Sequence, residues 1–134
     1  MNTSFKMDTQ KLRLYHSENN GWHKAIELQV HEIPEMEKLL KDTLIMGESE
    51  HHTDERTGKH LFTEELKKQQ QEMEKLNKEI EDQQNKIKVN ESFDMNTCID
   101  VFCTQDILRE RIKNIEKKYL ELKCNLLYYL SNLT

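Results

Sequence analysis

The chain has 134 residues, of which 35% are hydrophobic and 34% charged, and its formal net charge is -5 at pH 7. So small an apolar fraction argues against a large globular core, whereas long helices that each bury one narrow stripe fit it well. The negative charge argues against unspecific nucleic-acid binding, and no apolar run approaches the roughly 20 residues that span a bilayer. We therefore expect a mainly α protein with no nucleic-acid partner and no membrane span.

The first ten residues lack the apolar stretch of a secretory signal, and the three cysteines form no C-x-x-C motif. Three cysteines cannot all pair within one chain, so reduced thiols in a cytoplasmic protein are expected, with cytoskeletal or nuclear association left open. Residues 1–10 are polar and are expected to be disordered.

Residues 11–46 are expected to form a small N-terminal unit. Apolar and polar residues alternate on both sides of an Asn20-Gly21 turn signal, at Leu12, Leu14, Ile26, Leu28 and Val30. This pattern favours a β-hairpin over 11–31. A helix through the same residues also fits their spacing, but the residue before Pro34 is disfavoured in the α conformation.

Pro34 suits the first position of a helix, so a short amphipathic helix is expected over 34–46. Residues 47–61 are polar, contain two glycines and show no periodicity, which predicts a flexible linker. The linker holds several histidines, but adjacent histidines in a flexible loop do not provide the converging ligands of a zinc site. No metal site is expected.

The region 62–134 is expected to form a coiled coil. A first ladder of apolar residues at seven-residue spacing predicts a helix over 62–90, with Gln69 and Gln83 as polar residues on its seam. A second ladder, stronger and interrupted only at Gln105, predicts a helix over 98–133. The residues expected to bind a partner through these seams are Leu66, Met73, Leu76, Ile80, Ile87, Leu108, Ile112, Ile115, Tyr119, Leu122, Leu126, Leu127, Tyr129, Leu130 and Leu133.

Two arrangements of these ladders remain open. The eleven residues between Ile87 and Cys98 equal seven plus four, so one long helix with a stutter is possible. Alternatively, a turn near Asp94 gives an antiparallel helical hairpin, which the pairing of seam and flanking residues favours. It would place Gln83 opposite Gln105, Glu79 near Arg111, and Glu72 near Lys118.

The last turns of the second ladder carry apolar residues off its seam, at Leu120, Leu127, Tyr128 and Leu130. Docking of the 34–46 helix could cover them and complete a three-helix bundle. A partner could cover them instead, since exposed apolar patches usually mark interaction sites. Neither possibility is preferred.

No catalytic or cofactor motif is present in the sequence. Cys98 falls on the seam and is expected in the core, whereas Cys103 and Cys124 fall opposite it and should be exposed, with no base at a spacing that would activate them. The function expected is that of a non-enzymatic coiled-coil adaptor or scaffold subunit, of the kind found in cytoskeletal, ciliary, kinetochore or trafficking complexes. It would bind protein partners as a homo- or hetero-oligomer. The alternatives are a secreted four-helix cytokine-like ligand and a short product of a larger coiled-coil protein.

Overall fold

The computed structural model describes residues 4–6, 9–46, 52–89 and 92–133, with the side chains of 10–43, 58–87 and 95–132. In chain order the elements are β1 (Ser4–Lys6), α1 (Thr9–Met46), α2 (His52–Val89), β2 (Ser92–Asp94) and α3 (Met95–Leu133). The expectation of a mainly α protein is confirmed. Within the described residues, no helix is long and apolar enough to cross a membrane.

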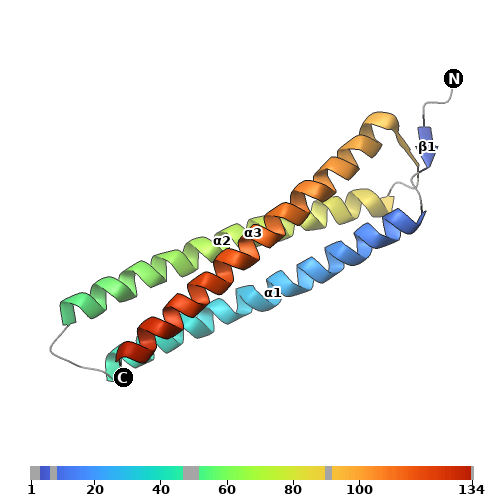
Figure 1. The fold of residues 1–134 in the computed structure, drawn as a ribbon. Helices are drawn as coiled ribbons and strands as arrows, with labels where there is room; N and C mark the ends of the chain where they lie inside the picture. Colours follow the sequence, from blue (N-terminus) through green and yellow to red (C-terminus); the bar gives the residue numbers. More distant parts are fainter. Residues whose placement is uncertain (1–3, 7–8, 47–51, 90–91, 134) are drawn as a thin grey trace.

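The three long helices lie side by side in an up-down-up arrangement (Figure 1). The end of α1, the beginning of α2 and the end of α3 lie at one end of the bundle, which we call the C-terminal end. The two short strands lie at the other end, where β1 pairs antiparallel with β2, and Ser4 is opposite Asp94. Because α2 is antiparallel to both other helices, α1 and α3 run in the same direction.

The predicted β-hairpin over 11–31 is wrong, because this segment belongs to α1. Ile26, Ile33 and Leu40 repeat every seven residues and are all fully buried, which is the period of a helix packed on its neighbours. The alternation of Ile26, Leu28 and Val30 is a coincidence within this longer pattern, since Leu28 is exposed and Val30 only partly buried.

Pro34 does not begin a helix but lies inside α1. Proline removes one backbone donor from a helix, but at Pro34 the ring lies on the exposed face, where it disturbs no core packing. The predicted 34–46 helix is thus the last third of a 38-residue helix. The predicted linker is also shorter than expected, since residues 52–61 form the first turns of α2, while residues 47–51 lie outside the described part. The N-terminal segment expected to be disordered contains β1 and the beginning of α1.

In the C-terminal half, α2 and α3 are separate helices, with β2 between them, rather than one continuous helix. Two of the side-chain pairs expected from a fold about Asp94 are confirmed. Gln83 Nε2 donates a hydrogen bond of 3.3 Å to Gln105 Oε1, and Arg111 forms an ion pair with Glu79. Glu72 and Lys118 line the same groove between α2 and α3.

All three helices contribute to the main hydrophobic core. Alpha1 provides Ile26, Ile33, Met36 and Leu40, and the ladder residues of α2 and α3 pack against them. Met36 and Leu40 share this core with Leu126 and Leu130, so the last third of α1 docks on the C-terminal end of the bundle. This docking covers Leu130 and makes the fold a three-helix bundle.

Two helical glycines with opposite surroundings give a matched test of this packing. A Cβ on Gly21 would meet nothing within 4 Å, whereas a Cβ on Gly58 would lie 2.6 Å from Cζ of Tyr129. We expect Gly21→Ala to raise the free energy of unfolding by about 0.5–1 kcal/mol, because alanine restricts the unfolded chain and favours the helix. We expect Gly58→Ala to lower it by about 1 kcal/mol through overpacking.

Urea denaturation of both variants measures these changes. Equal stabilisation by the two substitutions would show that α2 does not pack on Tyr129 in the way described.

Candidate partner-binding surface

Most residues expected to bind a partner are instead used by the bundle itself. The buried members of that set are Leu66, Met73, Leu76, Ile80, Ile87, Leu108, Ile112, Ile115, Tyr119, Leu122, Leu126 and Leu130. They pack α2 and α3 against each other and against α1. A partner could reach these side chains only if the bundle opened.

The other three members lie near the end of α3. Tyr129 is half-buried, with its ring 5.1 Å from that of Phe62 at an angle of 41°. Leu127 is 46% exposed and is accessible in the folded bundle. The side chain of Leu133 lies outside the described part.

Five large apolar side chains are exposed in the half of the bundle nearer the C-terminal end. Leu120 and Leu127 keep 58% and 46% of their surface, and Tyr128 keeps 71%. Leu39, near the end of α1, and Leu61, near the beginning of α2, are also exposed. We call these five residues the C-terminal apolar surface. Sequence analysis had singled out its three α3 members as lying off the seam.

Leu39 and Leu61 were missed by sequence analysis. Leu39 belonged to the expected short amphipathic helix, where it was indistinguishable from its buried neighbour Leu40. Leu61 fell at the end of the predicted linker, where no helical period was recognised. The heptads of α1 and α2 place both residues beside the seam rather than on it, but this signal is readable only once both helices are known to be long.

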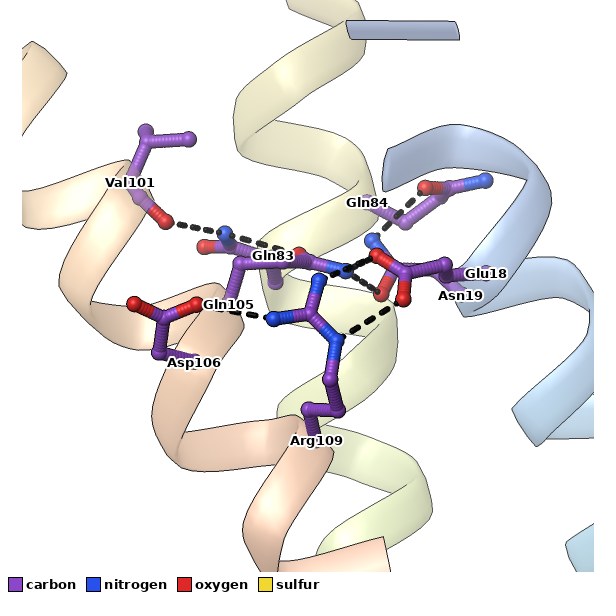
Figure 2. A network of polar contacts seen from close by, with 8 residues as sticks. All are labelled: Glu18, Asn19, Gln83, Gln84, Val101, Gln105, Asp106 and Arg109. Carbon is purple, nitrogen blue, oxygen red and sulfur yellow. Dashed lines mark hydrogen bonds and ion pairs between the residues drawn. The ribbon is translucent and has the colours of Figure 1, made fainter. Parts of the chain in front are cut away.

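A layer of buried amides crosses the bundle near its other end, with one member in α1 and three in α2 and α3 (Figure 2). Gln105 Nε2 donates to Asn19 Oδ1 at 2.9 Å, and Asn19 Nδ2 donates to Gln84 Oε1 at 3.1 Å. Gln83 Nε2 donates both to Gln105 Oε1 and to the carbonyl of Val101. Because each amide is satisfied by the next, the layer fixes how the three helices align.

Ion pairs join α1 to α3 on either side of the bundle's midpoint. Arg109 donates two hydrogen bonds to the carboxylate of Glu18, through Nε at 2.9 Å and an Nη at 2.7 Å. These hydrogen bonds raise the pKa of Arg109 above its usual value, so the pair stays charged. Two-point contact of this kind orients the helices more strictly than a single ion pair does.

Glu32 makes the second connection. It accepts hydrogen bonds from the Tyr119 hydroxyl and, at 2.9 Å, from Lys123 Nζ. The bond from Tyr119, together with that from Lys123, lowers the pKa of Glu32. Burial and the neighbouring carboxylate raise the pKa of Tyr119, so its hydroxyl remains a donor. Tyr119 is therefore a core residue with a paired polar tip.

Among the described residues, no group of three or more His, Cys, Asp or Glu side chains could hold a metal ion. The expected placement of the cysteines is confirmed: Cys98 is buried, and Cys103 and Cys124 are exposed, all three as free thiols. The side chains of His51 and His52 lie outside the described part.

No protein-family model, curated protein or solved structure matches the chain. Its class therefore rests on its own fold: a three-helix bundle with a buried amide layer near one end and an exposed apolar surface at the other.

Proposed function

We propose that the chain is a non-enzymatic adaptor that binds a protein partner through the C-terminal apolar surface. The observation that supports this proposal is the exposure of five large apolar side chains at an end where the core beneath them, at Leu126 and Leu130, is already filled. Burying such side chains releases roughly 25 cal/mol per Å² of apolar surface removed from water. Grouped apolar side chains on a folded surface usually mark a site of protein association.

The partner is expected to be helical. Leu120 and Leu127 lie seven residues apart on α3, so both project from one side of that helix, and a second amphipathic helix can pack along such a row. Tyr128 adds an aromatic ring with a hydroxyl, a combination enriched at protein interfaces. Association of this kind suits a scaffold subunit of a larger assembly.

We also propose that α2 and α3 pack as a coiled-coil hairpin to which α1 adds a third helix. The heptad spacing of the buried residues supports this packing, as does the pairing of Gln83 with Gln105. In this proposal the seams hold the bundle together, and the partner binds outside them.

A pair of double variants tests the function. Leu120→Glu with Leu127→Glu places two charges on the C-terminal apolar surface, whereas Leu14→Glu with Ile107→Glu places two charges at similarly exposed sites elsewhere on the bundle. Affinity capture with quantitative mass spectrometry should show at least a tenfold loss of specific partners for the first variant only. Circular dichroism should show unchanged helix content for both.

Equal recovery of the same partners by the first variant and the wild type would contradict the proposal. Analytical ultracentrifugation of the purified chain distinguishes a homo-oligomer from a hetero-oligomer. Self-association that the first variant abolishes indicates a homo-oligomer. A chain that stays monomeric at high concentration indicates that the surface binds a different protein.

The secreted four-helix class gains no support from the structure. The described residues contain three helices, and the three cysteines are free. No observation favours that class over the adaptor.

A further inference from the structure

The buried apolar side chains of the described residues fall into two clusters of very different size. The main cluster contains fifteen buried residues from all three helices. The smaller cluster, near β1 and β2, contains only Tyr15, Ile87, Cys98 and Val101. Asn19, Gln83, Gln84 and Gln105 lie between the two clusters along the helices. The amide layer therefore divides the hydrophobic core.

Alpha1 makes a small contribution to the smaller cluster. Tyr15 is its only buried member from α1, and Leu12 packs against the cluster while partly exposed. The remaining contacts lie at the edge of the cluster. The Tyr15 and Phe102 rings meet edge-on with their centroids 6.1 Å apart, and Lys11 Nζ lies 4.5 Å from the centroid of the Phe102 ring. The other three members lie at the end of α2 and the beginning of α3: Ile87 near Val89, and Cys98 and Val101 shortly after Met95.

We propose that residues 9–17, which we call the N-terminal latch, open away from α2 and α3 while the main cluster stays folded. The amide layer provides the boundary for this opening. Apolar groups lose their main stabilisation when water reaches them, but amides exchange one set of hydrogen bonds for another with water. A break at the amide layer is therefore less unfavourable than a break through packed apolar residues, and opening stops where the main cluster begins.

Polar contacts at the amide layer hold the end of the latch. Gln84 Nε2 donates a hydrogen bond of 3.3 Å to the backbone carbonyl of His16, and opening exchanges this bond for one with water. Glu18 is held to Arg109 by two hydrogen bonds and marks the point where the latch joins the rest of α1. Before it, β1 pairs with β2 over three residues only. Two-stranded pairing of this length is marginal in water, so β1 cannot by itself hold the latch closed.

Opening uncovers an apolar strip on α2 and α3. Ile87, Cys98 and Val101, which pack with Tyr15 in the closed bundle, become accessible together. The strip lies at the opposite end of the bundle from the C-terminal apolar surface. In the closed state Tyr15 of the latch packs against the strip, so only the open state exposes it.

Cys98 reports directly on the latch. It is buried under Tyr15 in the smaller cluster, and burial raises the pKa of its thiol, so the closed form reacts slowly with thiol reagents. Cys103→Ser with Cys124→Ser removes the two exposed thiols and leaves Cys98 as the single reactive group. The rate of Cys98 labelling by a disulfide reagent then measures opening in the native protein.

Two variants in this background distinguish local opening from global unfolding. Tyr15→Ala removes the latch's buried side chain and should raise the Cys98 labelling rate at least tenfold. Ile33→Ala truncates the main cluster, so it should shift the urea midpoint downward but change the labelling rate less than twofold. In the Cys103→Ser, Cys124→Ser protein without a further substitution, low urea should accelerate Cys98 labelling only weakly, because the latch exposes little surface when it opens.

The latch is refuted if Cys98 is labelled only as fast as the whole chain unfolds. In that case labelling would rise steeply with urea, and the two variants would speed it in proportion to their loss of global stability. The dependence on urea decides the question even if Tyr15→Ala does not fold, since it requires only the background protein.

Discussion

Gln105→Leu is expected to lower the free energy of unfolding by about 2–4 kcal/mol, although leucine nearly matches glutamine in size. Gln105 is fully buried and exchanges hydrogen bonds with Gln83, Asn19 and Glu18. Leucine would leave Asn19 Oδ1 buried without a donor and would remove an acceptor from Gln83. Each buried polar group left unpaired costs about 1–3 kcal/mol, so the loss comes from the partners rather than from a cavity.

Gln71→Leu is the matched control, since Gln71 lies on the exposed face of α2. Its effect should stay within about 0.5 kcal/mol. Urea denaturation followed by circular dichroism measures both variants. The double variant Asn19→Leu with Gln105→Leu should lose less stability than the sum of its single variants, because each change removes a partner that the other left unpaired. Strict additivity would show that the amide layer is not a connected network.

The amide layer also shows how much of α2 and α3 could be predicted from sequence. Their heptads were readable because each buries one stripe, and two of the three glutamines on those stripes, Gln83 and Gln105, could be matched to one another from the sequence. Whether the chain turned near Asp94 stayed open, since no glycine or proline marks that turn. The alignment of two polar seam residues was the better guide.

The helical conformation of α1 was not predictable in the same way, and Asn19 explains why. In isolation, Asn19-Asn20-Gly21 has the composition of a turn. In the bundle, Asn19 is buried and hydrogen-bonded to Gln84 and Gln105, which lie 65 and 86 residues further along the chain. Only these distant partners make asparagine suitable for the interior of a helix, so local propensity pointed to the wrong element.

The burial of most residues expected to bind a partner was not predictable for a related reason. A heptad seam indicates that a helix packs against something, but it does not distinguish a partner from another segment of the same chain. Because most of the segment that forms α1 was expected to be a β-hairpin followed by a short helix, the seams were left open to a partner. Once α1 is a helix, the seams are occupied, and the exposed residues beside them become the candidates.

Leu126→Ala and Leu127→Ala are expected to separate core packing from partner binding at two adjacent positions of α3. Leu126 is 0% exposed in the main cluster, whereas Leu127 is 46% exposed on the C-terminal apolar surface. Removing the Leu126 side chain leaves a cavity among packed helices, which costs about 2–5 kcal/mol of folding free energy. The same change at Leu127 should alter stability by no more than about 0.5 kcal/mol.

The two substitutions should affect partner binding in the opposite order to their effects on stability. Leu127→Ala should weaken capture of the partner with the fold intact, while Leu126→Ala should weaken it only in proportion to the fraction of chain that is unfolded. Urea denaturation and quantitative capture on the same two proteins measure both quantities. If Leu127→Ala proves the more destabilising of the two, then the face of α3 turned towards the core is not the one described, and the assignment of the C-terminal apolar surface fails with it.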